Sequence, residues 1–513
     1  MLVDTQYRLS SKKLIVSYVD KEGEIKLKYY DWPEPTEFIN CDEKDPDKTK
    51  YISWDGKPTK KVPTTHPDRF AIYEFLDALP KEEQDIIFEY NVPKIFFIDI
   101  ETRYTSENGY SNARDADNEV LSISIVHEDT LWILGLLPMP KDMQKRIIDN
   151  TNTYFKNFNI TYKFVYKLYD DEFSMLYDFF NNMMPKMPMT TGWNYIRYDW
   201  QYLVNRCKKI FKVVNGKKLT IDPSVSSPTK KMVEKKIKDT DIIDSSMPLH
   251  RMIFDYMHLY EAFDTRIKVK ESSSLDFVSK KLVNVDKIKY NGSLQKLYDT
   301  DFEKFMFYNA VDSILVQKIH ESQNYISIVY AISDLAKMQI RDIITINQKT
   351  GKPAISSIPV TVAVLRNRFR DMRNIVLFRQ KTDKSEDAGT KIAGGWVKEP
   401  LVGMNQWCAT YDFSSLYPTL QRQHFIAPEL YVGTRSRKTP NKTLEGVDIN
   451  PEIHTVTRND KVFLKEDSPS IRMLSEIFSD RKKYKKLMLA KKEEYNKVLQ
   501  QIEEYENNKK RPN

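Results

Sequence analysis

The chain has 513 residues, of which 41% are hydrophobic and 12% aromatic; it is too long for one core and too apolar for a disordered protein, and about three domains are expected. Its 80 Lys and Arg against 72 Asp and Glu give a net charge of +8, which favours a polyanionic partner only weakly. Three widely spaced cysteines, no signal-peptide pattern and no long apolar run argue against a disulfide framework, structural zinc and a membrane span, so a cytoplasmic protein is expected.

The N-terminal part, residues 1–92, contains short strand-like runs at Leu14–Tyr18 and Ile25–Tyr30, joined by polar connections rich in Lys and Pro. No catalytic pattern occurs in this part. We therefore predict a mixed N-terminal domain whose role cannot be read from its residues.

The pattern changes at residues 95–100, an apolar run interrupted by Asp99 that predicts a strand covered on both faces of a sheet. A hairpin is predicted after it, with strands at 121–126 and 131–136. Asp99 and Glu101 lie two apart on the first strand, so the pleat directs both carboxylates to the same face.

Helical periodicity follows at residues 171–184 and 199–211. Asp199 falls where a loop enters the second of these helices. The Lys- and Ser-rich stretch 214–250 has little periodicity and predicts loops or a hairpin.

A third helical segment, 300–320, carries Tyr308 and Asp312 one turn apart, so both lie on the same helix face. Each acidic pattern alone is more often a solvated surface. Taken in this order, the carboxylates predict a cluster that is stable only when divalent cations neutralise it: Asp99, Glu101, Asp199 and Asp312. The chemistry predicted is metal-dependent phosphodiester hydrolysis.

Residues 321–375 are predicted to be mostly helical, and a β-rich region is expected after Gly394-Gly395. Its last strand, Trp407–Tyr411, would end at Asp412 before a tight turn. A carboxylate there, followed by backbone N–H groups, suits a Mg²⁺ that bridges a triphosphate. Tyr417 is bulky enough to exclude a 2′-hydroxyl.

The segment 470–508 predicts a long, charged helix. Arg481 and Lys485 are one turn apart on it and share a face. Such a run most often forms a solvated basic face of a helix. The alternative is that these two side chains bind phosphate groups.

The motifs around the first four carboxylates resemble the three proofreading motifs of family B DNA polymerases, above all those of large tailed bacteriophages. The resemblance implies an RNase H-like 3′→5′ exonuclease acting on single-stranded or frayed DNA ends. In that family the matching carboxylates bind two Mg²⁺ per site, Mn²⁺ being accepted by the same ligands, and the residue matching Tyr308 positions water. Tyr198 stands where many relatives have Phe and would stack on a base.

The sequence around Asp412 is similar to the first palm motif of the same family. The resemblance implies that Asp412 binds metal and that Gly394 and Gly395 contact the template. It also implies that the incoming nucleotide is bound by residues of the turn and of the basic helix face: Ser414, Ser415, Leu416, Tyr417, Arg481 and Lys485.

The expected architecture is an α/β, α+β multidomain chain. Its expected parts are an N-terminal domain (1–93, with 321–375 packing on it), an exonuclease domain (94–320), a partial palm (376–469) and a first fingers helix (470–513).

No Asp-Thr-Asp motif, second fingers helix or thumb follows Asp412. We therefore expect the N-terminal subunit of a split polymerase, an exonuclease by itself and a polymerase only with a second polypeptide. The expected partners are primer–template DNA, single-stranded 3′ ends, dNTPs and that second chain, through which any sliding clamp would bind. The alternatives are a truncated nucleic-acid-binding or regulatory module and a stand-alone exonuclease.

Overall fold

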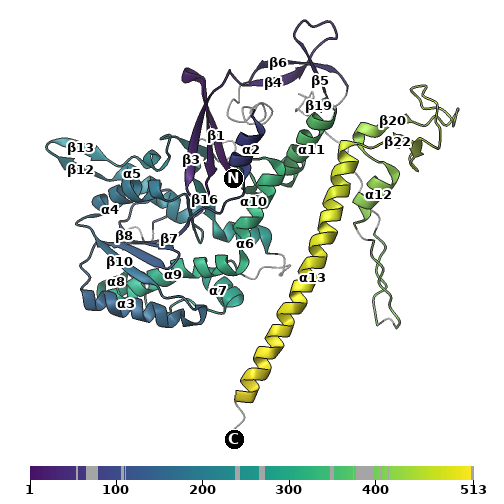
Figure 1. The fold of residues 1–513 in the computed structure, drawn as a ribbon. Coiled ribbons are helices and arrows are strands. Elements are labelled where there is room, and N and C mark those ends of the chain that lie inside the picture. Colours follow the sequence, from purple (N-terminus) through teal and green to yellow (C-terminus); the bar gives the residue numbers. More distant parts are fainter. Residues whose placement is uncertain are drawn as a thin grey trace. The chain divides into compact units, whose positions relative to one another are not determined.

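The computed structural model describes residues 1–53, 56–64, 79–105, 109, 111–236, 243–264, 272–346, 352–373, 375–376, 397–404, 406–413 and 415–509. They form two compact units, one made of Met1–Glu37 and Val62–Ala363, the other of Phe38–Lys61 and Val364–Asn513. Sheets and helices alternate along the chain (Figure 1), which confirms the predicted mixed α/β class.

The first unit begins with an antiparallel three-stranded sheet of β1 (Leu2–Arg8), β2 (Lys13–Val19) and β3 (Ile25–Asp31). The two strands predicted in this part are β2 and β3. Helix α2 (Lys81–Phe88) is joined to β3 through Glu83, whose Oε2 accepts hydrogen bonds from Lys28 Nζ (2.6 Å) and Tyr30 OH (2.9 Å).

A six-stranded mixed sheet forms the centre of the first unit, in the order β10-β9-β8-β7-β11-β16. Its strands are β7 (Ile95–Thr102), β8 (Val120–His127), β9 (Thr130–Gly135), β10 (Lys163–Leu168), β11 (Met189–Gly192) and β16 (Met252–Asp255). The pairs β7–β8 and β8–β9 are antiparallel, as the predicted hairpin requires, whereas β11 runs parallel to both β7 and β16.

Strand β7 is covered on both faces, as its apolar run predicts. Phe97 packs in one core with Val311, and Ile98 and Ile100 pack in the other with Leu203. Figure 1 shows α4 and α5 on one side of the sheet and α3, α8 and α9 on the other. Alternate residues of β7 therefore point to different helices.

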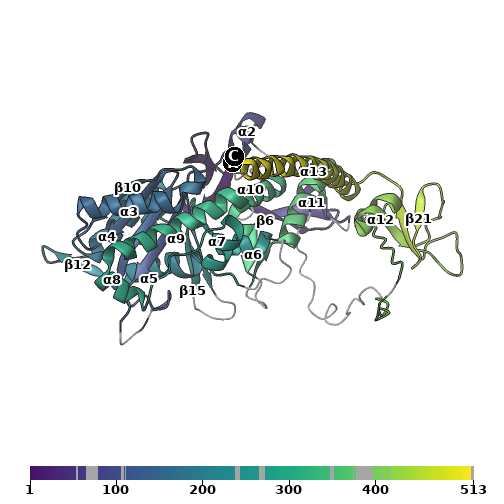
Figure 2. The same cartoon turned by 90° about the horizontal axis from the view of Figure 1, so that it is seen from below.

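The helices of the first unit include the three segments with predicted periodicity. They are α3 (Lys141–Tyr154), α4 (Glu172–Asp178), α5 (Gln201–Lys209), α6 (Tyr256–Phe263), α7 (Leu275–Val283), α8 (Leu294–Thr300), α9 (Phe302–Gln323) and α10 (Tyr325–Ala336). In Figure 2, α10 follows directly on α9; Asn324 separates them with a φ of 48°. Helix α11 (Ser357–Arg373) comes next in the chain, so 321–375 is largely helical as predicted.

The described residues also form short helical segments: 3-10 turns η1 (Leu9–Ser11), η2 (Lys156–Phe158), η4 (Met184–Lys186), η6 (Pro223–Ser226), η7 (Ile340–Asp342) and η8 (Pro428–Leu430), and π-helical segments η3 (Phe179–Met183) and η5 (Ile196–Trp200).

The Lys- and Ser-rich stretch forms two hairpins, β12–β13 (Phe211–Val214, Lys217–Thr220) and β14–β15 (Met232–Lys236, Ile243–Pro248). The first turns at Asn215-Gly216, both with positive φ (50° and 75°), the usual chemistry of a two-residue hairpin loop. A third hairpin pairs β17 (Ile344–Ile346) with β18 (Pro353–Ile355).

The second unit contains a four-stranded sheet, β19-β5-β6-β4, and a three-stranded sheet, β20-β22-β21. The strands are β4 (Thr36–Asn40), β5 (Lys48–Ser53), β6 (Pro58–Pro63), β19 (Ile375–Val376), β20 (Tyr431–Thr434), β21 (His454–Val456) and β22 (Lys461–Leu464). Its helices are α12 (Leu416–His424) and α13 (Pro469–Lys509), the latter being the predicted charged helix.

The predicted strand at Trp407–Tyr411 is wrong. Residues 397–404 and 406–413 contain no strand, and the side chains of Trp407 and Tyr411 are 98% and 93% exposed. An apolar run becomes a strand only when a neighbouring strand pairs with its backbone, and within the described ranges no strand pairs with this segment.

None of the helices in the described ranges is both long enough and apolar enough to cross a membrane.

Candidate functional site

Strand β7 carries the first two predicted site residues on the face that packs against α9. Asp99 pairs in register with Ser124 of β8, and Glu101 with Ser122. Both carboxylates point to one side of the sheet, as the pleat predicts, and Glu101 is buried.

Helix α9 brings Tyr308, Asn309 and Asp312 against this strand face. Asn309 Nδ2 donates to Asp99 Oδ2 (3.0 Å), and Asn309 Oδ1 accepts from Ser122 Oγ (3.0 Å). The amide thus holds the first carboxylate and the neighbouring strand in one arrangement. Its role could not be predicted, because an Asn in a helix has many ordinary functions.

Asp99, Glu101 and Asp312 converge: one carboxylate oxygen from each lies within 4.8 Å of the others. Burial, and then the charge of Asp312, raises the pKa of Asp99 to about 8. Burial also raises the pKa of Glu101 and of Asp312 above their ordinary values. Three acids this close cannot all be ionised unless a positive charge lies among them.

Lys287 supplies one positive charge at the edge of this trio. Its Nζ lies 2.6 Å from Asp312 Oδ2 and donates to Tyr308 OH at 2.7 Å. Burial alone would lower the pKa of Lys287, but the charge and hydrogen bond of Asp312, together with the charges of Asp99 and Glu101, raise the pKa above its ordinary value. Sequence reasoning missed this lysine, because it stands among many lysines on a segment without a motif.

The remaining lone pairs fit a hard divalent cation. Asp312 Oδ1 is buried and has no hydrogen-bond partner among the residues that the structure describes. Buried carboxylate oxygens are normally paired, and a set of carboxylate oxygens is the donor chemistry that Mg²⁺ and Mn²⁺ prefer. Asp99, Glu101 and Asp312 would hold the cation.

Asp199 stands beside the trio and is not part of it. It lies in η5 at the start of α5, where the sequence places it, and its Oδ1 accepts a hydrogen bond from Ile100 N (3.1 Å). Burial, and then the nearby charge of Asp99, raises the pKa of Asp199 well above its ordinary value. Of the four predicted carboxylates, the structure brings three together and attaches the fourth to the backbone between two of them.

Tyr198, predicted to stack on a base, uses its hydroxyl group within the protein. Its OH lies 3.3 Å from Thr102 Oγ1, and its ring lies 5.6 Å from that of Tyr202. A Phe at this position could not make the first contact.

The second predicted site belongs to the second unit. Asp412 is exposed on an irregular segment, and Ser415 directly precedes α12, whose first residues are Leu416 and Tyr417. Arg481 Nη1 donates to Ser415 Oγ (3.3 Å), so the structure brings the basic helix to the turn after Asp412.

Lys485 is exposed one turn further along α13. Helix α12 packs on the start of α13, where Arg422 Nε donates to Ser475 Oγ (3.0 Å). The predicted residues Gly394, Gly395 and Ser414 lie outside the described residues.

Comparison with known proteins finds two matching family models along the chain. Residues 57–278 match the model of the DNA polymerase family B exonuclease domain, and residues 354–505 match the DNA polymerase family B model.

Three relatives illustrate the similarity. The DNA-directed DNA polymerase of Escherichia phage RB69 is 24% identical over 502 residues, covering 92% of this chain and 52% of the relative. The DNA-directed DNA polymerase of Enterobacteria phage T4 is 25% identical over 331 residues, covering 64% of this chain and 34% of the relative. The DNA polymerase delta catalytic subunit of Dictyostelium discoideum is 25% identical over 323 residues, covering 60% and 26%.

The chain thus spans about half the length of the RB69 relative and about a third of the T4 relative, at 52% and 34%. Asp99, Glu101 and Asp199 lie within the matched exonuclease segment, whereas Asp312 lies beyond its end at residue 278. Asp412 and most of α13 fall in the second match. From these two domain matches in succession, the chain belongs to the family B DNA polymerases.

Proposed function

We propose that the first unit is a metal-dependent 3′→5′ exonuclease that removes nucleotides from single-stranded or frayed DNA ends. The observation that carries this proposal is the convergence of Asp99, Glu101 and Asp312, with an unpartnered buried oxygen on the last. The match to a family B exonuclease domain supports the choice of DNA as substrate.

Each residue near the trio has a proposed part. Two divalent cations, when bound, would supply the charge that polarises the scissile phosphate and lowers the pKa of an attacking water. Tyr308 and Lys287, already hydrogen-bonded to each other, would orient that water through the tyrosine hydroxyl. Asp199 would hold β7 in place through its hydrogen bond from Ile100 N. Its carboxylate would also serve as a further ligand of the cations.

The proposed second activity is DNA synthesis around Asp412, in which Tyr417 selects deoxyribose while Arg481 and Lys485 hold the phosphates of the incoming dNTP. The contact between Arg481 and Ser415 supports this arrangement. Gly394, Gly395 and Ser414 keep their proposed template and nucleotide contacts.

Two-metal phosphoryl transfer needs a second carboxylate beside Asp412. We propose that a second polypeptide supplies it, together with the second fingers helix, the thumb and any contact with a sliding clamp. The proposed domains are 1–93 with 321–375, 94–320, 376–469 and 470–513, and the proposed place of action is the cytoplasm of the host cell, in keeping with the phage relatives.

The test is hydrolysis of a 5′-labelled single-stranded oligodeoxynucleotide with Mg²⁺, comparing the native chain with Asp99→Ala. We expect the variant to lose roughly a thousandfold or more in rate, because a ligand of the catalytic cations is removed. Binding of the oligonucleotide should change by less than about threefold, since most of that affinity comes from backbone contacts.

Asp85→Ala is the matched control, because Asp85 is an exposed acid on α2 and its removal should leave the rate unchanged. Equal hydrolysis by Asp99→Ala and the native chain would contradict the proposal, as would loss of DNA binding together with hydrolysis. Primer extension by this chain alone, without a second polypeptide, would contradict the proposed division of the polymerase.

A further inference from the structure

Between β7 and β8 the structure describes residues 103–105, 109 and 111–119; this part of the connection begins two residues after Glu101 and is attached to the protein at both ends. Arg103 Nε and Nη2 both donate to Glu119 Oε2 (2.9 and 2.6 Å). Asn118 Nδ2 donates to the carbonyl oxygens of Arg103 (2.8 Å) and Gly109 (2.9 Å). The residue that follows the catalytic strand is therefore tied to the far end of the same connection.

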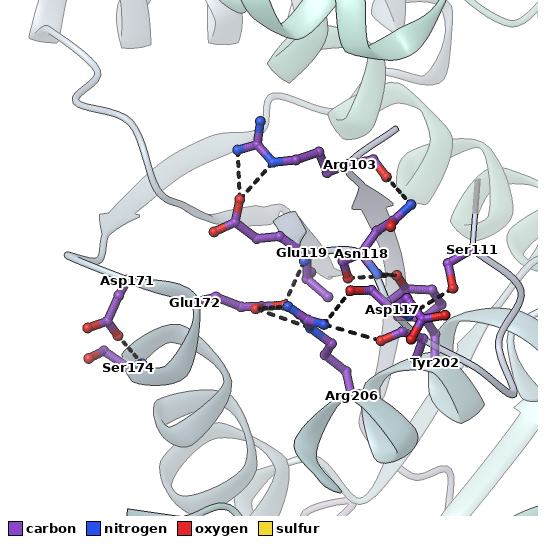
Figure 3. Close-up of polar contacts among 12 residues, drawn as sticks. Arg103, Ser111, Asp117, Asn118, Glu119, Asp171, Glu172, Ser174, Tyr202 and Arg206 are labelled. Atoms are coloured by element: carbon purple, nitrogen blue, oxygen red, sulfur yellow. Dashed lines mark hydrogen bonds and ion pairs between the residues drawn. The ribbon is translucent and has the colours of Figure 1, made fainter. Parts of the chain in front are cut away.

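Helix α5, which follows Asp199, holds this connection through side chains on one of its faces. Tyr202 OH donates to Asn118 O (2.7 Å) and accepts from Asn118 N (3.1 Å), and Asn205 Nδ2 donates to Ala113 O (3.0 Å). These two side chains lie one turn apart on α5. Figure 3 shows Tyr202 and Arg206 rising from α5 towards Asp117 and Asn118.

Arg206 joins the connection to a buried ion pair. Its Nη1 donates to Asp117 O (2.6 Å) and Ala116 O (3.3 Å), while Nε and Nη2 form a fork on Glu172 (2.8–3.2 Å). Both side chains of this ion pair are largely buried, at 14% and 8% exposure. Glu172 Oε1 also accepts from Val120 N (2.7 Å), the first residue of β8.

The hydrogen bonds from α5 to the connection end on backbone carbonyl and amide groups, so α5 determines the path of the main chain there. The same helix begins beside Asp199, whose carboxylate accepts from Ile100 N. A shift of α5 would therefore move the connection relative to the carboxylate trio. Ordering the connection in advance also removes an entropic penalty from substrate binding.

We propose that residues 103–105 and 111–119 form a fixed wall of the nuclease site against which the 3′ end of a DNA strand is aligned, with Tyr202, Asn205 and Arg206 as positioning residues. This inference rests on the proposed exonuclease function. The wall presents the exposed side chains of Tyr104 and Arg114, an aromatic face and a guanidinium that suit a base and a phosphate.

The test uses two variants of the full chain that remove the attachments without leaving a lone buried charge. Asn205→Ala removes the bond to Ala113 O. The double variant Glu172→Gln with Arg206→Met removes the donors to Ala116 O and Asp117 O, while the glutamine oxygen still accepts from Val120 N. Lys217→Ala, an exposed change on the β12–β13 hairpin, is the control.

The first readout is amide hydrogen exchange across residues 111–120, which needs no activity. We expect at least tenfold faster exchange in the double variant, a smaller increase in Asn205→Ala and no change in the control. Unchanged exchange in the double variant would overturn the anchoring role of α5, whatever the enzyme does.

The second readout is kcat and KM on a single-stranded oligodeoxynucleotide, with Mn²⁺ affinity measured on the same samples. We expect kcat to fall about tenfold in the double variant, because a small misplacement of the reacting bond lowers the rate steeply, with KM and Mn²⁺ affinity within about threefold. Arg206→Lys, which keeps the charge and loses the fork, should be intermediate.

Faster exchange with unchanged kcat would show that the connection is not part of the site and would overturn the proposal. An equal loss of Mn²⁺ affinity would assign Arg206 to the metal centre and overturn it as well. Absence of hydrolysis by the native chain would remove the proposed function itself, and the exchange data would then still decide the anchoring role.

Discussion

At the scale of single residues, the candidate nuclease site balances like charges with one lysine. Asp312 has one oxygen 2.6 Å from Lys287 Nζ and one buried oxygen without a hydrogen-bond partner in the described part of the chain. The lysine neutralises part of the cluster, and the second oxygen is suited to a cation. Removing the lysine or the cation leaves buried carboxylates without a compensating positive charge.

Lys287→Met should therefore destabilise the metal-free protein more than the metal-bound protein. In EDTA we expect the free energy of unfolding to fall by about 2–3 kcal/mol, because the buried carboxyl group of Asp312 loses its ion-pair and hydrogen-bond partner. With saturating Mn²⁺ the loss should be smaller by about 1 kcal/mol or more, since the cation replaces the missing charge. Chemical unfolding with and without metal measures both values.

Lys280→Met serves as the comparison, because Lys280 pairs with Asp286 at a position where both side chains are about half exposed or more. Exposed pairs contribute only about 0–1 kcal/mol. The same loss for Lys287→Met in EDTA and in Mn²⁺ would mean that Lys287 acts only in packing.

At the scale of secondary-structure elements, the close parallel contact of β11 with β7 aligns the second motif with the first. Gly192 ends β11, and a Cβ atom on it would overlap the carbonyl oxygen of Ile98 on β7. A glycine is needed here for close approach of two backbones and not for an unusual backbone angle. The sequence shows the glycine in its motif, but the neighbour that excludes a side chain is known only from the fold.

Gly192→Ala should lower the free energy of unfolding by about 2–3 kcal/mol, because β11 must move away from β7 or distort it. Gly216→Ala isolates the other kind of glycine effect: its φ is 75° and nothing lies within 4 Å of an added Cβ. We expect about 1 kcal/mol for that change. Denaturant unfolding of both variants makes the comparison, and equal losses would argue against the overlap.

Two strands predicted from apolar runs had different outcomes, and again the neighbouring backbone explains the difference. Residues 95–100 lie in β7, whereas Trp407–Tyr411 form no strand. Both runs are apolar, so local propensity does not separate them. Partner strands β8 and β11 pair with the first, and the backbone of the second has no such neighbour in the described ranges.

At the scale of the whole molecule, the chain forms two compact units and the two predicted sites fall in different ones. The carboxylate trio belongs to the first unit, and Asp412 with Arg481 belongs to the second. Residues that belong to separate packed units generally act independently when mutated.

Asp412→Ala should accordingly leave hydrolysis of single-stranded DNA within about twofold of the native rate. In an enzyme completed by the proposed second polypeptide, the same change should abolish primer extension, because a metal-binding carboxylate is lost. Exonuclease and extension assays on the same preparation measure both. Loss of both activities together would contradict separate sites.

The sequence by itself determined the family, the α/β class and the spacing that brings Asp99 and Glu101, or Tyr308 and Asp312, to one face. Strand and helix periodicities are local properties, and a short motif contains all the information they need. The site residues of the second unit were likewise named from a local motif, and their roles stay a prediction.

Only the tertiary structure decided that Lys287 pairs with Asp312, that Asn309 holds Asp99, that Asp199 bonds to Ile100 N and that α5 anchors the connection after β7. These contacts join segments far apart in the chain, and several of them end on backbone atoms that every residue possesses. Such partners leave no mark in the identity of the side chains, so their positions follow only when the sheet and its helices are packed.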